Sequence, residues 1–328
     1  MQARMIGAER LRACVGLDDL IEPVSRALQM ASAGRAATGL IIMYPHANRS
    51  CGDVFVKTGT LEGAPIHVVK IAPWFAENID RGEPQGGLWA VLDSATGRTR
   101  ALLDDQHYLS DIRTAAAGAL AARVLAPPIV RTAGVLGSGV QAWWQTIALY
   151  WERPFEKLLL WARDRSKAGH LATRIHCRLP EVTIKIFDEA EAVVRHSDVL
   201  ITATGSRNPI VRGAWLHPGQ HITAVGADDP SKCELDAAAL NRARVFADGI
   251  DEAIANGDIH RAISEGDYAP SALRADLGAV LGGKSQGRTS IDDITIAKLV
   301  GIGAQDVAAA IVALEKCGGY DAFDGGDD

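Results

Sequence analysis

The second half of the chain alternates short apolar runs with helical patterns, and this alternation restricts the fold more than any other feature. From Arg131 onward, runs of four to seven apolar residues are separated by segments with helical spacing. Such runs are typical of strands that are buried on both faces of a parallel sheet. The pattern predicts an α/β domain with a doubly wound parallel sheet. The expected strands are TAGVLG, KLLLWAR, VTIKIF, DVLITAT, HITAVGA and ARVFAD.

A glycine-rich turn follows the first of these strands and opens a helix. Residues 137–142, GSGVQA, fit the pattern G-x-G-x-x-A, and a further strand follows the helix. Glycine leaves the backbone N–H groups at a helix N-terminus open to a pyrophosphate. Glycine pairs also close ordinary turns, but the strand-turn-helix-strand context favours a dinucleotide site. The residues expected to bind the cofactor here are Gly137, Ser138, Gly139, Val140 and Gln141.

The end of the second strand indicates which dinucleotide binds. NAD sites commonly place an acid there, which accepts from the ribose 2′-hydroxyl. The chain has Ala162 at this position, and Arg163 and Arg165 follow, as suits a 2′-phosphate. Asp164 lies between the two arginines and can serve NAD instead. We therefore expect NAD(P) with Ala162, Arg163 and Asp164 near the ribose, and we favour NADP(H).

The first third of the chain predicts a second, α+β part. A helical pattern at residues 17–32 is followed by five short apolar or alternating runs, typical of strands, between residues 38 and 105. An alanine-rich helix is expected at residues 108–126, with Ser110 or Asp111 as its N-cap. Before these elements, the N-terminus is expected to be irregular chain that enters a helix. At the other end, residues 292–319 are expected to form one long helix and residues 320–328 a loose acidic tail.

Composition excludes several classes of protein. The net charge of −6 comes without basic clusters, so nucleic acid is not an expected partner. No apolar run reaches the roughly 18 residues that span a bilayer, and the N-terminus lacks the apolar core of a signal peptide. We therefore expect a cytoplasmic protein that does not bind membranes. The five cysteines show neither CxxC nor Cys/His spacing, so no metal site or disulfide framework is expected.

Seven longer segments resemble the ornithine cyclodeaminase/µ-crystallin family, in the family's order, between Lys70 and Asp306. The resemblance implies a homodimer of two-domain subunits. It implies a Rossmann-type dinucleotide-binding domain at residues 126–296, and a discontinuous α+β substrate-binding and dimerisation domain at residues 1–125 with 297–328. The segments are VVKIAPW, DIRTAAAGALAA, GVLGSGVQA, ITATGSRNPIV, HPGQHITAVGADDPSKCELD, ADLGAVLGGKSQGR and DDITIAKLVGIGAQDVA.

The chemistry that this family implies is hydride transfer between nicotinamide and the carbon that bears the nitrogen of a small amino acid or imine. In a cyclodeaminase the hydride returns after ammonia leaves. In a ketimine or cyclic-imine reductase, or in an amino-acid dehydrogenase, it does not return. The same residues serve each reaction, so the type stays open. The alternative is a µ-crystallin-like protein that binds NAD(P)H or another ligand with little catalysis. Three segments, VKIAPWF, TAAAGALAA and GIGAQDVA, are closest to the ectoine-utilisation branch.

Three charged residues match functional residues of the family. Asp228 matches the catalytic aspartate, which exchanges a proton with the substrate nitrogen, and the spacing to Pro230 favours it over Asp229. Lys70 and Arg113 match basic residues that bind the substrate carboxylate, and we also assign Lys70 to catalysis. Lys70 lies in an otherwise apolar strand, where an ammonium needs a compensating partner or ligand. Arg113, near a helix start, presents a fork of donors to a carboxylate.

Other small and polar residues complete the expected cofactor site. Thr114 belongs to the RT pair that family members use near the cofactor phosphates. Thr204 and Ser206 are expected either to line the cofactor cleft or to cap a turn locally. Gly226 permits close approach at the VGAD turn.

The chain departs from the family at two places. Many members carry an arginine upstream of the lysine strand, and Tyr44, Arg49 and Lys57 are the alternatives here. Ala297 and Leu299 stand where members often have phenylalanine and serine near the nicotinamide. Both differences weaken the case for ornithine itself as the substrate.

Overall fold

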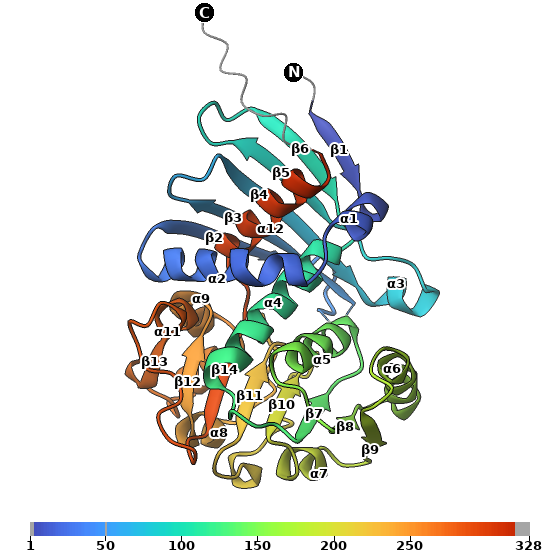
Figure 1. Cartoon of the computed structure of the whole chain (residues 1–328), viewed down its shortest axis with the longest axis vertical. Helices are drawn as coiled ribbons and strands as arrows, with labels where there is room; N and C mark the ends of the chain where they lie inside the picture. The colour runs from blue at the N-terminus through green and yellow to red at the C-terminus, as the bar shows by residue number, and fades with distance from the viewer. Residues whose placement is uncertain (1–2, 50, 319–328) are drawn as a thin grey trace, which may run out of the picture. The chain divides into compact units, whose positions relative to one another are not determined.

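The computed structural model describes residues 3–49 and 51–318 of the chain (Figure 1). These residues form two compact units. One extends to Arg113 and resumes at Ile302, and the other is Thr114–Gly301. The predicted acidic tail at residues 320–328 lies outside the described residues.

The first unit is built on a six-stranded sheet with the order β1-β6-β5-β4-β3-β2. Strands β2 to β6 pair antiparallel, and β1 adds a parallel edge. Helix α12 contacts α2 and strands β2, β3 and β4. The elements are β1 (Arg4–Gly7), α1 (Ala8–Cys14), α2 (Asp18–Ser32), β2 (Ala36–Met43), β3 (Gly52–Leu61), β4 (Ile66–Phe75), α3 (Ala76–Arg81), β5 (Leu88–Asp93), β6 (Thr99–Asp104), the start of α4 (Tyr108–Leu125) and α12 (Gly303–Lys316).

Small residues let α12 lie directly on the sheet. A Cβ atom added to Gly59 of β3 would come within 2.2 Å of the Gly303 carbonyl oxygen, so the two backbones touch. The hydroxyl of Thr38 accepts the Gly303 N–H at 2.8 Å and satisfies a donor of the first turn. Nearly all of α12 is buried as a result. The first turn of α12 is thereby held against the edge strand β2 and its neighbour β3.

The second unit contains an eight-stranded sheet with the order β13-β12-β14-β11-β10-β7-β8-β9. All its pairings are parallel, as the apolar runs predict, and the α/β class with a Rossmann-type sheet is confirmed. The elements are β7 (Thr132–Leu136), α5 (Val140–Glu152), β8 (Lys157–Trp161), α6 (Arg165–Arg178), β9 (Thr183–Ile186), α7 (Ala190–Arg195), β10 (Val199–Thr202), β11 (His221–Ala224), α8 (Ala237–Arg242), β12 (Arg244–Ala247), α9 (Ile250–Ala255), α10 (Gly257–Ser264), β13 (Leu273–Asp276), α11 (Leu277–Leu281), β14 (Thr295–Lys298) and two 3-10 turns, Gly213–Trp215 and Pro270–Ala272.

The strand order reverses at β7. The chain moves outward from β7 through β8 to β9 and then returns to β10 on the other side of β7. In open parallel sheets, ligands bind in the crevice at such a switch point, beyond the carboxyl ends of the strands. The glycine turn follows β7, the ATGS loop follows β10 and the VGAD loop follows β11, so the three predicted segments meet at one edge.

Several predictions for the chain ends were wrong. Residues 4–7 form strand β1, which pairs with β6, and are not irregular chain. Four residues give too short a pattern to read, and the partner lies far along the sequence. Helix α4 begins at Tyr108, so neither Ser110 nor Asp111 is its N-cap. Asp105 takes this part, since its carboxylate accepts from the backbone N–H groups of His107 and Ser110.

The predicted long helix at residues 292–319 is also wrong. Its first apolar run is strand β14, which lies between β11 and β12, and α12 begins only at Gly303. Gly301 between them has a φ of 81°, which ends regular structure. The expected domain boundaries, 125/126 and 296/297, therefore shift to 113/114 and 301/302. Residues 297–301 belong with the parallel sheet, and α4 from Thr114 packs in the second unit.

No helix in residues 3–49 and 51–318 is both long and apolar enough to cross a bilayer.

Candidate functional site

The two glycines of the turn after β7 are required for different reasons. Gly137 has a φ of 130°, and a Cβ atom there would lie 2.4 Å from the carbonyl oxygen of Ala203 in the loop after β10. Gly139 has open space where its Cβ would be, with no heavy atom within 4 Å. Gly137 thus allows the loops after β7 and β10 to make backbone contact. Gly139 leaves open space at the N-terminus of α5.

The N-terminus of α5 is suited to an anion. No side chain caps it, and its first turn carries no acid. Ser138 is partly exposed, and Gly139 and Val140 are exposed. Free N–H groups and the helix dipole favour a phosphate at such a place. The bare glycine, the open space and the uncapped turn together fit the pyrophosphate of a dinucleotide.

Gln141 lies in the first turn of this helix, and Thr114 lies close to the helix. The Gln145 side chain of α5 donates from Nε2 to the carbonyl oxygen of Thr114 at 3.0 Å and to Gln141 Oε1 at 3.3 Å. Gly118 of α4 allows this contact, because a Cβ there would clash with Gln145 Oε1 at 1.8 Å. The structure therefore brings Thr114 beside the glycine turn's helix, as the RT pair requires.

The residues after β8 separate into different roles. Ala162 directly follows the strand, and Arg163 is exposed. Asp164 is the N-cap of α6 and accepts from Ser166 N at 2.9 Å and Lys167 N at 3.1 Å. Arg165 forms an exposed ion pair with Asp188. The Asp164 carboxylate is thus committed to the helix, and Arg163 is the charge beside the expected ribose position.

The hydroxyl groups of the ATGS loop bond within the protein. Thr204 Oγ1 donates to Glu234 Oε1 at 2.8 Å, and Ser206 Oγ donates to the carbonyl oxygen of Asn208 at 2.6 Å. The Ser206 contact matches the local-turn alternative, and Thr204 Oγ1 also accepts locally from Ser206 N at 3.2 Å, although its own proton goes to Glu234, 30 residues away. Cofactor contact stays a prediction for both residues. Gly226 permits close approach to this loop, since an added Cβ would lie 2.3 Å from the Thr204 carbonyl oxygen.

The neighbouring acids Asp228 and Asp229 differ sharply in their surroundings. Asp229 is 1% exposed and accepts from both the N–H and the hydroxyl of Ser231 at 2.6 Å, so it builds the turn. The Asp228 side chain is 36% exposed and pairs with Lys232 Nζ at 2.7 Å. Strand β11 ends at Ala224, so Asp228 lies on a loop beyond it and not at the strand end. Of the two, Asp228 is the carboxylate that a ligand can reach.

Lys70 and Arg113 share one buried counter-ion in the first unit. Lys70 Nζ lies 2.8 Å from Asp306 Oδ1, and Arg113 Nε lies 2.9 Å from the same atom. Arg113 also donates from Nη1 to Gln305 Oε1 at 3.0 Å. All three charged side chains are almost fully buried. Asp306 stands in the first turn of α12 and faces the Lys70 strand, so the packing of α12 explains how a lysine is tolerated there.

Three basic residues, Lys57, Lys70 and Arg113, act on the one Asp306 carboxylate. Burial lowers the pKa of Lys70 to about 7, against the attraction of Asp306 and with the help of Arg113 and Lys57. Burial alone would raise the pKa of Asp306, but the charges of Lys70 and Arg113 outweigh it and lower the pKa. Burial raises the pKa of Asp105, against the attraction of Lys70.

Lys57 is the upstream basic residue that belongs to this cluster. It pairs directly with Lys70 in the β3–β4 register and is 6% exposed. Arg49 instead lies 4.3 Å above the ring of Tyr44. Sequence reasoning missed Asp306 and Asp105 as site residues. An acid inside an otherwise apolar helix, as in GAQDVAAA, was the available signal for Asp306.

Among the described residues, no group of three or more His, Cys, Asp or Glu side chains is arranged to hold a metal ion.

The fold and these sites define a two-unit protein with a Rossmann-type sheet, and comparison with known proteins gives its family. The model of the ornithine cyclodeaminase/mu-crystallin family matches residues 2–319. The chain therefore belongs to this family, as the sequence segments predict. The ectoine-utilisation branch stays a prediction.

Three relatives illustrate the similarity. A Rhizobium meliloti protein described as a dehydrogenase is 39% identical over 272 residues, which is 83% of this chain and 82% of that protein. The structure of Thermococcus litoralis Δ1-pyrroline-2-carboxylate reductase with NADH and L-proline has a TM-score of 0.88 and 28% identity, covering 95% of this chain and 97% of that one. An archaeal alanine dehydrogenase dimer with bound NAD has a TM-score of 0.88 and 29% identity, covering 96% of each chain.

Asp306→Asn should destabilise the protein strongly. It leaves Lys70 and Arg113 buried together with their shared counter-ion neutralised, and breaking a buried pair costs about 3–5 kcal/mol. Glu77→Gln is the matched control in the same unit, because the Glu77–Arg81 pair is solvent-exposed and screened. The free energy of unfolding in urea measures both. Equal losses for the two variants would contradict the importance of the buried cluster.

Proposed function

We propose that this protein is an NAD(P)-dependent enzyme that transfers a hydride between the nicotinamide and the nitrogen-bearing carbon of a small amino acid or its imine. One observation carries the proposal. The accessible acid Asp228 and the glycine turn lie on loops at the same carboxyl edge of one parallel sheet. A cofactor held at that turn has an acid on a nearby strand's loop, which suits proton transfer to or from nitrogen.

In the proposed reaction, separate residues would bind the cofactor and transfer the proton. Gly137, Ser138 and Gly139, with the first N–H groups of α5, would hold the pyrophosphate, and Ala162 and Arg163 would face the ribose. The bound nicotinamide supplies or accepts the hydride. Asp228 would take a proton from the amine during oxidation or return one to the imine during reduction.

The cation cluster supports an α-carboxylate on the substrate. Lys70 and Arg113 are buried with Asp306 as their shared acid, and Lys57 adds a third positive charge. A carboxylate bound there would balance the excess charge. The two solved relatives described above, a reductase and a dehydrogenase, favour a reaction in which the hydride does not return. Redox-neutral cyclodeamination, in which the hydride returns, is the competing reaction, and the assay described below distinguishes the two.

Replacement of Asp228 by Asn should nearly abolish turnover. The amide keeps the shape of the side chain but cannot accept the proton, so kcat should fall by about 100-fold or more. Binding of NAD(P)H, followed by its fluorescence, should change by no more than about twofold, because the pyrophosphate site is untouched. Turnover is measured at 340 nm with cyclic imino acids in reduction and with L-alanine or L-proline in oxidation.

Three results of that assay would count against the proposal. Retention of kcat in Asp228→Asn removes this residue from the mechanism. Conversion of ornithine without a net absorbance change indicates cyclodeamination. Tight cofactor binding without turnover of any substrate favours a ligand-binding role.

For the coenzyme, we propose a preference for NADP(H). Arg163 is exposed beside the end of β8, while Asp164 is engaged as the α6 N-cap. Arg163→Ala should weaken NADPH binding by about tenfold, roughly one ion pair with a phosphate. NADH affinity should hardly change. Arg195→Ala on α7 is the control, because Arg195 is exposed and already paired with Glu191. Tighter binding of NADH than of NADPH by the wild-type protein would overturn this preference.

The sheet of the first unit has an apolar face that supports a homodimer. Ile41, Val56, Ile71 and Leu88 stand opposite one another across β2 to β5 and therefore share one face. Ile41 is 62%, Ile71 40% and Leu88 36% exposed, whereas the other face carries the buried Lys70 and contacts α12. A continuous exposed apolar surface of this kind is typical of an interface. We propose that two copies pack through this face, related by twofold symmetry.

Ile41→Asp should convert the proposed dimer to a monomer, because burial of an unpaired charge in an apolar interface is costly. Ile129→Asp is the matched control, since Ile129 is 72% exposed but belongs to the other unit. Sedimentation velocity gives the mass of each variant. A monomeric wild-type protein, or dissociation of both variants, would argue against this face.

A further inference from the structure

One buried carboxylate, that of Glu234, receives four hydrogen bonds from the end of β10 and from the loops after β10 and β11. Its Oε1 accepts from Thr204 N at 2.6 Å and from Thr204 Oγ1 at 2.8 Å. Its Oε2 accepts from Thr202 Oγ1 at 2.7 Å and from Gly226 N at 2.9 Å. Glu234 is fully buried. A carboxylate offers about four lone-pair sites, and all of them are filled here.

The two loops that Glu234 joins are those after β10 and β11. Thr204 lies in the first loop, and Gly226 lies in the second, two residues before Asp228. A Cβ on Gly226 would come within 2.4 Å of Thr204 N and 2.6 Å of Glu234 Oε1. The loops and the carboxylate are therefore packed at backbone contact, and only glycine fits between them.

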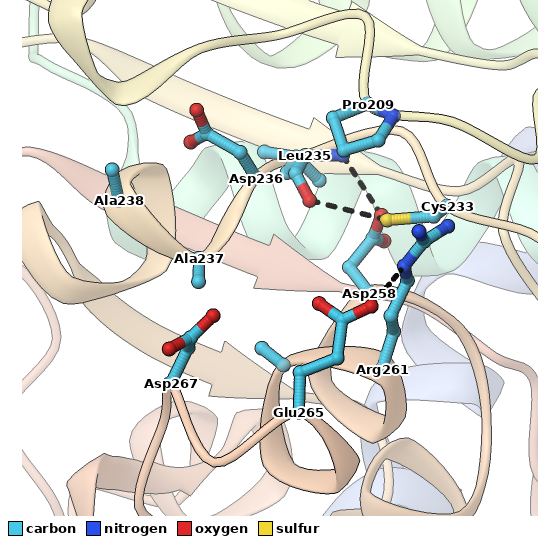
Figure 2. Close-up of a pocket in the computed structure, with 11 residues that line it drawn as sticks. Pro209, Cys233, Leu235, Asp236, Ala237, Ala238, Asp258, Arg261, Glu265 and Asp267 are labelled. Carbon is cyan, nitrogen blue, oxygen red and sulfur yellow. Dashed lines mark hydrogen bonds and ion pairs between the residues drawn. The ribbon is translucent and has the colours of Figure 1, made fainter.

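The backbone of Glu234 is held by the buried ion pair of Asp258 and Lys298. Asp258 Oδ1 accepts the N–H groups of Glu234 at 2.5 Å and Leu235 at 2.9 Å, the latter drawn in Figure 2. Asp258 Oδ2 accepts from Lys298 Nζ of β14 at 2.7 Å. Glu234 thus has its main chain tied to an interior strand and its side chain tied to both loops.

The acidic residues that line a pocket next to Glu234 bind other groups. Figure 2 shows this pocket, about 270 Å³, lined by Cys233, Asp236, Asp258 and Glu265 among others. Asp236 caps α8, and Glu265 pairs with Arg261. Glu234 does not line this pocket. Its carboxylate is therefore committed to the loops at the carboxyl edge.

We propose that Glu234 is a positioning residue for the hydride-transfer reaction, which ties Gly226 to Thr204 and so sets where Asp228 presents its carboxylate. The inference rests on the proposed function of Asp228. Burial, and then the charge of Asp258, raise the pKa of Glu234 to about 7, against Lys298 and the hydrogen bonds to the two threonines. A buried acid is retained at this place although an apolar side chain would avoid the desolvation.

Glu234→Gln tests this role with the smallest change of shape. One carboxylate oxygen becomes an NH2 group, which cannot accept. The hydroxyls of Thr202 and Thr204 can rotate to accept from it, but the N–H of Gly226 or of Thr204 is left without its acceptor. Displacement of a catalytic group by about 1 Å costs up to about 100-fold in rate, so kcat should fall by about 10- to 100-fold. KM for the substrate carboxylate, set by Lys70 and Arg113, should stay nearly constant.

Asp198→Asn is the matched control. Asp198 also accepts two backbone N–H groups, from Arg131 and Thr132, but at the start of β7 and β10, the opposite edge of the same sheet. Both N–H groups bond to Oδ2, whose place the amide oxygen of Asn can take, so this variant should leave kcat unchanged. Unchanged kcat in Glu234→Gln, or equal losses of kcat in both variants, would overturn the proposal.

Amide hydrogen exchange separates failure of this inference from failure of the proposed function. In Glu234→Gln, the amides of residues 203–206 and 225–229 should lose protection, and they should keep it in Asp198→Asn. If the wild-type protein turns over no substrate, the proposed function fails, and exchange alone still decides whether Glu234 ties the two loops. Unchanged protection in Glu234→Gln would show that it does not.

Discussion

The proposed cofactor site depends on one constraint, the common register of the parallel strands β7, β10 and β11. Val199 of β10 pairs with both Ala133 of β7 and His221 of β11, and the three strands end level with one another. Their following loops must therefore meet at one edge, although they are far apart in the sequence. The backbone contacts at Gly137 and Gly226 follow from this arrangement. The same constraint puts Asp228 on the edge where the uncapped α5 helix offers its N–H groups.

Each unit places charges in its interior and neutralises them with partners distant in sequence. Asp306 of α12 serves Lys70 and Arg113, and Asp258 of α10 serves Lys298. Burial of such pairs rarely adds stability over apolar packing, because desolvation offsets the attraction. These buried ion pairs are thus better explained by the groups that their charges bind or position. In the first unit this is the proposed substrate carboxylate, and in the second it is the geometry of the loops around Asp228.

Local sequence patterns were sufficient to predict the elements whose apolar residues are contiguous or regularly spaced. The parallel strands, the glycine turn and α5 were predicted because apolar runs and turn chemistry are local signals. The errors fall where the deciding partner is remote. The TIAK run is a strand only because β11 and β12 flank it, and residues 4–7 are a strand only because β6 accepts them. Asp105 caps α4 because two residues with positive φ, Gln106 and His107, turn the chain back over it.

By itself, the sequence determined the fold class and the family. It also predicted the turn that suits a dinucleotide and the charged residues Lys70, Arg113 and Asp228, since each lies in a contiguous motif. Only the tertiary structure decided which charges meet. It buried Asp229 and left Asp228 accessible, and it placed Lys57 opposite Lys70 across a strand pair. It also brought Asp306 to Lys70, and Glu234 to the loops before Asp228. The physical reason is that ion pairs and hydrogen bonds form between groups that are close in space, whatever their separation along the chain.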